Sequence, residues 1–319
     1  MFGLFKSPNI KIEDTVKAPQ SKVHRYWTTK GFREFYTNFR GGLALPKNIA
    51  RNSESPKKIQ EVFKLKGFQF GNWLSNEDRY NYLAAIYICL HDLNKVLKFK
   101  GANLGLDQNL VISFGARGSS GALAHYEPAN LVINVTRYKR MDLINKQRAA
   151  VGQRPIELTK LERFVYTGGV GSFAHEYGHY LDYYFGSHYD VNPKAKALTA
   201  GSSTYPKRIK WPKTSKLRNL TEDILQKIIW QNEQKGIPSK YWNGLLDKDK
   251  KPHAYFAARN EIFARAFEQY IGFKLKKLGI QNKFLHKLKY TRSVYVPATQ
   301  FKKVVPLFDK LIREMRMYF

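Results

Sequence analysis

The stretch Ser172-Phe-Ala-His-Glu-Tyr-Gly-His-Tyr-Leu-Asp182 predicts a helix that begins after Gly171 and carries two histidines four residues apart. Residues at this spacing lie on one face of an α-helix, so the imidazoles of His175 and His179 can reach a single metal ion. Glu176 lies between them and is placed to hold a water molecule on that ion. The stretch therefore predicts a helix that binds a metal through its side chains.

A catalytic metal site needs a third protein ligand and an open position for water. The longer motif with a third histidine is absent, because positions 182 and 185 are Asp and Phe. We predict Glu261 as the third ligand, since a helix over residues 260–271 places Glu261 and Glu268 on one face. The pair Asn260-Glu261 also resembles the second zinc-binding helix of gluzincins.

The second helix departs from the thermolysin-like pattern at one position. Arg265, rather than an aspartate, lies four residues after Glu261. Asp182 is the predicted replacement for the missing supporting carboxylate, and it is also the alternative third ligand. A purely structural interpretation stays open: the histidines would form hydrogen bonds in a core, and Glu261 and Glu268 would pair with Arg259 and Arg265.

The order His-Glu-x-x-His is typical of zinc-dependent hydrolases, so we expect Zn²⁺ bound by His175, His179 and Glu261. Glu176 is the predicted catalytic residue, which takes a proton from the attacking water and passes it to the leaving amine. The expected substrate is a protein or peptide, extended along an edge strand at residues 131–135. The sequence leaves five candidates for the group that stabilises the oxyanion: Arg117, His125, His253, Tyr255 and Arg265.

The remaining pattern predicts an α+β fold with a zincin-like metallopeptidase core. This core consists of a small mixed sheet, the active-site helix and a following helical part, with basic flanking segments. A helix is expected to start at Ser75 and to run to Leu97. Three strands are expected at residues 110–114, 123–126 and 131–135, and further helices near residues 155–166, 221–234, 260–271 and 306–317.

The chain has 319 residues and a formal net charge of +30, and this charge is unevenly distributed. Residues 1–66 hold 14 Lys and Arg against 5 acids, residues 191–221 hold 8 against none, and residues 272–319 hold 12 against 2. We therefore expect a nearly neutral zincin-like domain at residues 67–271 that carries a basic insertion at 191–221. The basic segments suit non-specific nucleic acid or another polyanion as a partner.

Other classes of protein are disfavoured by the same sequence. The longest apolar stretch, residues 82–90, is about half of the roughly 20 residues that a membrane span requires. No secretory signal is apparent at the start, and the single Cys89 cannot form an intramolecular disulfide. We expect an intracellular protein in the host cytoplasm, or a virion-associated one.

Several blocks of the sequence resemble the first large polyvalent protein-associated domain, a family of phages and other mobile elements. The blocks cover about residues 66–272 and occur in the order 68–79, 114–118, 124–128, 132–136, 174–182 and 261–268. The resemblance implies a zincin-like metal site in a protein that travels with foreign DNA.

Two functional hypotheses follow. The first is a zinc-dependent hydrolase, a metallopeptidase of phage or mobile-element origin. The alternative is a basic virion or nucleic-acid-associated structural protein whose zinc site only joins two helices. Glu176 favours the enzyme, because a structural zinc site has no use for a general base and usually has four protein ligands.

Overall fold

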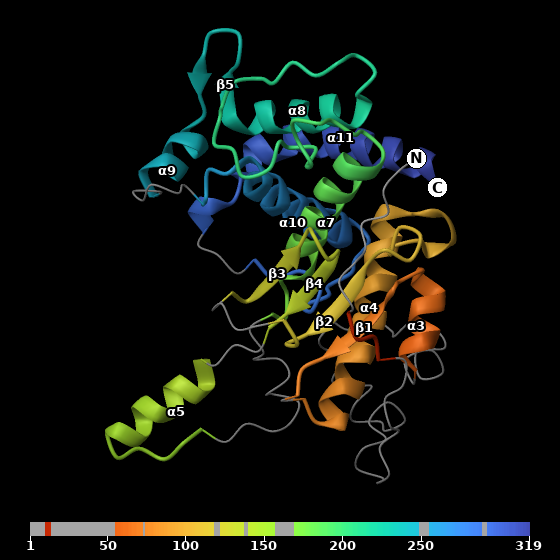
Figure 1. Cartoon of the computed structure of the whole chain (residues 1–319). Coiled ribbons are helices and arrows are strands. Elements are labelled where there is room, and N and C mark those ends of the chain that lie inside the picture. Colours follow the sequence, from red (N-terminus) through yellow and green to blue (C-terminus); the bar gives the residue numbers. More distant parts are fainter. Residues whose placement is uncertain are drawn as a thin grey trace. The chain divides into compact units, whose positions relative to one another are not determined.

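The computed structural model describes residues 10–13, 55–72, 74–117, 122–136, 140–156, 169–248, 255–288 and 292–319. These residues form helices and one small mixed sheet, so the predicted α+β class is confirmed (Figure 1). The chain divides into two compact units. The first contains residues 1–96, 101–173 and 278–287, and the second contains residues 97–100, 174–277 and 288–319.

The sheet of the first unit has four strands: β1 (Gly67–Phe70), β2 (Val111–Phe114), β3 (Ala124–Glu127) and β4 (Val132–Val135). Their order is β1-β2-β4-β3, with β1, β2 and β4 parallel and β3 antiparallel to β4. The three predicted strands are present, and β1 is an addition. The expectation of a small mixed sheet is confirmed.

The predicted edge position of residues 131–135 is wrong. β4 pairs with β2 along one side and with β3 along the other, so both of its hydrogen-bonding edges are occupied. An extended peptide adds only to a strand with an unpaired edge, which excludes β4 as the strand that aligns a substrate. The edge strand on this side of the sheet is β3.

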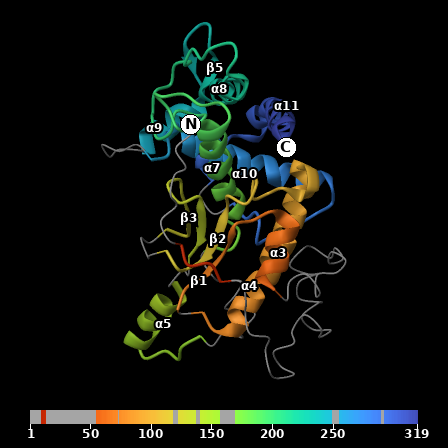
Figure 2. The ribbon, with the colours of Figure 1, turned by 45° about the vertical axis from the view of Figure 1, so that its right-hand side comes forward.

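The core of the first unit forms where α4 (Asn76–Leu97) covers the aromatic face of the sheet. Ser75 Oγ accepts a hydrogen bond of 3.1 Å from the Asp78 N–H, which confirms the predicted helix start. The Tyr82 ring lies 4.6 Å from that of Phe114. A second helix, α3 (Pro56–Phe63), lies beside α4 and contacts it through Phe63 (Figure 2).

The second unit is mostly helical. Its elements are α7 (Phe173–His188), α8 (Lys216–Ile229), the short hairpin β5 (Trp230–Asn232) and β6 (Ile237–Pro238), α9 (Lys240–Lys248), α10 (Arg259–Lys277) and α11 (Ala298–Met315). Three short 3-10 segments occur at residues 100–102, 292–294 and 316–318, and α5 (Arg140–Ala150) belongs to the first unit. No helix in the described part of the chain is long and apolar enough to cross a membrane.

The predicted helix limits differ from the observed ones where tertiary packing outweighs local signals. α8 ends five residues early because a hairpin follows it, and α10 continues past Gly272 to bury Leu275. α11 begins eight residues before Pro306 and contains it, which costs a backbone hydrogen bond within the helix. The helix predicted near 155–166 lies mostly in residues outside the described ranges, and α5 was not predicted.

The last helix is part of the core of the second unit. Phe308 of α11 is fully buried, and its ring lies 5.6 Å from that of Phe263, 6.1 Å from that of Phe267 and 5.1 Å from that of Tyr270. Segment 272–319 therefore contributes apolar packing as well as charge.

Arg218 organises the basic insertion from within the core. Its guanidinium is fully buried and donates hydrogen bonds of 2.7 to 3.0 Å to the backbone carbonyls of Asp190, Gly186, Ala195 and Ala197. A buried charge is tolerated only when its donors are satisfied, so these bonds fix the path of the chain near residues 186–197.

Candidate metal centre

The HExxH helix begins where the sequence predicts a sharp turn. Gly171 has a φ of 90°, a left-handed conformation that a residue with a side chain rarely adopts. Its backbone N–H donates to Phe284 and its carbonyl accepts from Lys287, which holds the turn on both sides. α7 starts two residues later, at Phe173.

Gly178 allows α10 to approach α7 closely. A Cβ atom at this position would lie 3.1 Å from the ring of Phe267 and 3.2 Å from the Cα of Ala264, which is tighter than ordinary packing. Gly178 lies between the two histidines of the motif, so the close contact occurs where their side chains leave the helix. Because glycine has no side chain, α10 lies close enough to α7 for the histidines to reach it.

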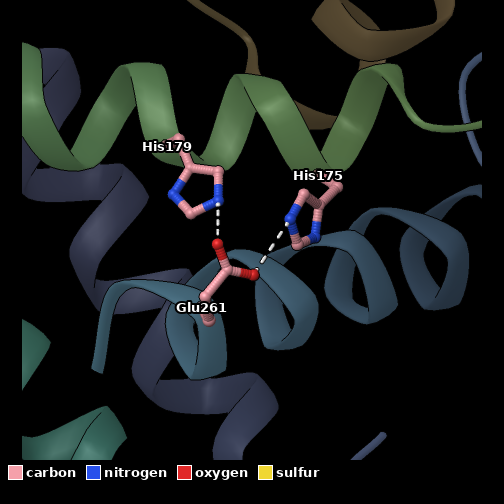
Figure 3. A group of neighbouring side chains, drawn as sticks. All are labelled: His175, His179 and Glu261. Carbon is pink, nitrogen blue, oxygen red and sulfur yellow. Dashed lines mark ion pairs between the residues drawn. The ribbon is translucent and has the colours of Figure 1, made fainter. Parts of the chain in front are cut away.

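His175, His179 and Glu261 form one buried group. The two imidazoles point from α7 toward the carboxylate on α10 (Figure 3). His175 Nε2 lies 3.5 Å from Glu261 Oε2, and His179 Nε2 lies 3.2 Å from Glu261 Oε1. The three residues are 5%, 7% and 7% exposed, respectively. The two predicted histidine ligands and the predicted third ligand therefore lie together.

The donor set fits a zinc ion. One ligand atom from each residue can be chosen so that all three lie within 4.8 Å of one another. Two imidazoles and one carboxylate are also the ligands of catalytic zinc sites that keep a fourth position open.

The electrostatics of this group favour an ionised Glu261 carboxylate beside the imidazole of His175. Burial acts to lower the pKa of His175, but its hydrogen bond to Glu261 and the negative charge of Glu176 raise this pKa to about 8. Burial acts to raise the pKa of Glu261, yet His179 and His175 hold it well below its usual range. Glu261 therefore stays ionised and needs a positive partner in its buried position.

Arg265 supports Glu261 from the same helix. Its guanidinium is fully buried, and Nη1 lies 3.3 Å from Glu261 Oε2. A second nitrogen donates to the backbone carbonyl of Phe256, and the guanidinium carbon lies 5.6 Å from the Phe256 ring centroid. The residue that departs from the thermolysin-like pattern thus holds the carboxylate of the predicted metal ligand.

The carboxylate of Asp182 is bonded to Thr199 and does not belong to the group formed by the two histidines. Its Oδ1 accepts a hydrogen bond of 2.9 Å from the Thr199 N–H, and its Oδ2 accepts one of 2.7 Å from the Thr199 hydroxyl. Burial raises the pKa of Asp182 to about 6, against the effect of these bonds. Glu261 is the acidic residue that groups with both histidines in the described part of the chain.

Two further buried carboxylates accompany the group. Glu176 is 6% exposed, and its charge acts on His175. Glu268 is 2% exposed and accepts a hydrogen bond of 3.1 Å from the Tyr295 hydroxyl. Burial raises the pKa of Glu268 to about 7, although the positive charge of His175 opposes this shift. No local pattern indicated Tyr295 or Thr199, because both reach the site from distant segments.

The five candidates for oxyanion stabilisation lie in different parts of the structure. Arg117 and His125 both pair with Glu127 in the first unit. Tyr255 is 47% exposed, and His253 lies outside the described residues. Of the five, Arg265 has a direct contact with the group of His175, His179 and Glu261, through Glu261.

Comparison with known proteins bears on the second helix of the site. The profile of the family described as large polyvalent protein-associated domain 1 matches residues 246–318. The match contains α10 and α11 and therefore Glu261, whereas His175 and His179 precede it. We expected the resemblance over about residues 66–272. The match shares residues 246–272 with this range and continues to residue 318. Neither a curated protein nor a solved structure matches the chain. The predicted resemblance to the large polyvalent protein-associated domain 1 is confirmed, and residues 246–318 carry it.

Proposed function

We propose that the protein is a zinc-dependent hydrolase with a zincin-like fold, a metallopeptidase of phage or mobile-element origin. The observation that carries the proposal is the buried group of His175, His179 and Glu261, with Glu176 on the same helix. A structural zinc site usually takes four protein ligands, and the group found in the described residues has three. The fourth position is then available for water.

The reaction class follows from the residues around that position. A zinc ion bound to the group would polarise a carbonyl and make a nearby water more acidic. Glu176 accepts the proton of the attacking water and delivers it to the leaving nitrogen, which is a poor leaving group unless it is protonated. Arg265 keeps the Glu261 carboxylate in place through its contact with Oε2. An amide in a protein or peptide is the substrate that this arrangement suits.

The test separates catalysis from metal binding. Purified protein is incubated with a fluorescent unfolded protein substrate, and its zinc content is measured in parallel. We expect hydrolysis that a chelator abolishes and added zinc restores. Glu176→Gln should lose hydrolysis by at least about 100-fold, the size of a general-base contribution, and should keep its zinc. Glu233→Gln, which changes an exposed glutamate outside the group, is the matched control.

One result would favour the structural alternative. If the wild-type protein holds a full equivalent of zinc and hydrolyses no peptide, or if Glu176→Gln hydrolyses as fast as the wild type, the site only joins two helices. A wild-type protein that neither holds nor binds zinc would contradict both hypotheses.

A further inference from the structure

Helices α8 and α11 of the second unit bring two basic segments of the chain together. They lie side by side in Figures 1 and 2. Lys216 at the start of α8 lies 3.8 Å from Glu314 near the end of α11. At the opposite end, the Gln300 amide donates to the backbone carbonyls of Lys227 and Ile228 at 3.1 and 2.7 Å. The helices are therefore antiparallel.

Each helix of this pair presents a basic stripe to solvent. On α11, Lys303, Lys310 and Arg313 are exposed and lie seven and three residues apart, which places them on one face. On α8, Lys216 and Lys227 are exposed and lie eleven residues apart, also on one face. A row of cations on two neighbouring helices is suited to a polyanion.

Surface acids near these stripes offset part of their positive charge. Asp223 and Glu233 both accept hydrogen bonds from Arg208, at 2.7 Å and at 2.6 and 3.0 Å, respectively. Asp309 on α11 pairs with Lys274 at 2.7 Å. One guanidinium offsets only one of the two carboxylates of Asp223 and Glu233. Arg208, Lys227 and Lys303 together therefore exceed these two acids by one positive charge, which is available to an anionic ligand.

A pocket of about 440 Å³ opens between the two helices and the hairpin that follows α8. Lys227 and Lys303 line it from the two helices, and Trp230 lines it from β5. The Trp230 indole N–H donates a hydrogen bond of 2.6 Å to Gln226 Oε1, which fixes the orientation of the half-buried ring. Gln231 adds a polar side chain, and Arg208 also lines the pocket together with its two carboxylate partners, Asp223 and Glu233.

We propose that this pocket binds one nucleotide of a single-stranded nucleic acid. Lys227 and Lys303 contact the phosphate, and the Trp230 ring stacks on the base. Stacking on an aromatic side chain requires a base that has left its duplex stack, which favours a single strand over a duplex. An acidic peptide would use the lysines alone and would make no use of the fixed indole. The basic stripes extend the contact to neighbouring phosphates.

Binding of fluorescein-labelled oligo(dT) to the full chain tests the role of the lysines, by anisotropy over a series of salt concentrations. In Lys227→Ala/Lys303→Ala, the slope of log affinity against log salt should decrease by about 0.7, since both lysines contact one phosphate and each neutralised phosphate on a single strand contributes about 0.7. Lys194→Ala/Lys276→Ala removes the same charge from exposed positions outside the pocket and is the matched control.

Variants of Trp230 test the stacking. Trp230→Leu should weaken binding by about 5- to 150-fold, the range for the loss of one stacked base, and Trp230→Phe should weaken it less. Oligo(dT) should also quench tryptophan fluorescence in the wild type, and Trp230→Phe should lose most of this change. Far-UV circular dichroism and zinc content show that each variant is folded.

Several outcomes would overturn the inference. If the pocket variant and the control variant weakened oligo(dT) binding equally, binding would depend on the overall charge of the protein and not on the two lysines of the pocket. If Trp230→Leu bound oligo(dT) as tightly as the wild type does, no base would stack on Trp230 in the pocket. Polyglutamate that competes as well as oligo(dT) would point to an acidic protein as the partner. Each result is independent of peptide hydrolysis, because no pocket residue belongs to the metal-binding group.

Discussion

Thr199 donates two hydrogen bonds to Asp182, one from its backbone N–H to Oδ1 at 2.9 Å and one from its hydroxyl to Oδ2 at 2.7 Å. Asp182 belongs to the HExxH helix, and Thr199 belongs to the loop that follows it. The pair is fully buried, so it anchors the loop on the helix and uses both carboxylate oxygens. This relationship assigns Asp182 a structural role and leaves Glu261 as the partner of the two histidines.

The first prediction separates these two carboxylates. Glu261→Ala removes one of three grouped ligand atoms, and we expect it to weaken zinc binding by more than the 10- to 100-fold typical of a supporting residue. Asp182→Ala should change zinc affinity less and lower the free energy of unfolding by about 1–3 kcal/mol, because it leaves the buried Thr199 donors unsatisfied. A zinc titration and urea unfolding measure the two effects. The reverse order of zinc affinities would make Asp182 the third ligand.

The second prediction concerns zinc content. The protein as purified should hold about one zinc ion per chain, and His175→Ala and His179→Ala should each empty the site, because two remaining ligands do not hold the ion. His188→Ala is the matched control, since His188 lies at the end of the same helix and donates to the Tyr184 carbonyl instead. Elemental analysis of the three variants checks the expectation. Retained zinc in both site variants would exclude the proposed ligands.

The third prediction is a pH dependence of stability in the metal-free protein. Burial raises the pKa of Glu268 to about 7 from an ordinary value of 4.5. Between these values the folded state binds more protons than the unfolded state, so the free energy of unfolding falls as pH rises. The fall due to Glu268 should reach about 3 kcal/mol by pH 8.

Glu268→Gln should remove that part of the decrease, so the variant gains stability relative to the wild type as pH rises from 5 to 8. Urea unfolding at both pH values in the presence of a chelator measures the difference. Glu61→Gln, at an exposed position of α3, serves as the control. Parallel pH profiles for the wild type and Glu268→Gln would show that Glu268 ionises normally in the folded protein.

The fourth prediction concerns the C-terminal segment. Phe308→Ala should lower the free energy of unfolding by about 3–5 kcal/mol, because it leaves a cavity among three aromatic rings of α10. Lys310→Ala, two residues later on the exposed face, should stay within about 0.5 kcal/mol of the wild type. Thermal unfolding compares the two variants. Similar stability of both would mean that α11 is not part of the core.

The packing of α11 also affects how the charge of segment 272–319 can be tested. Deletion of this segment removes Phe308 and the other buried side chains of α11 along with the lysines. A loss of nucleic-acid binding in the deleted chain would then not separate charge from folding. Single lysine substitutions on the exposed face avoid this problem.

The local sequence determined the elements that depend on short-range patterns. The spacing of His175 and His179 placed both imidazoles on one helix face, because the period of an α-helix is a local property. The capping serine before α4 and the left-handed glycine before α7 were recognisable for the same reason. Alternating apolar segments and turn residues predicted three of the four strands.

Tertiary structure alone decided which segments meet. The order of the strands gave β4 two partners and moved the edge to β3, although the apolar pattern of β4 is equally compatible with an edge. Phe301 and Val304, which precede Pro306, are buried, and the Phe301 ring lies 6.3 Å from that of Phe273 on α10, so this packing favours the extension of α11 through Pro306. Chain topology brings Thr199 to Asp182, and it places Lys303 of α11 around the same pocket as Lys227 and Trp230. These contacts join residues far apart in the chain, so no periodicity in the sequence encodes them. The pairing of Arg265 with Glu261 is different, because residues four apart on a helix are neighbours and the sequence offered this pair.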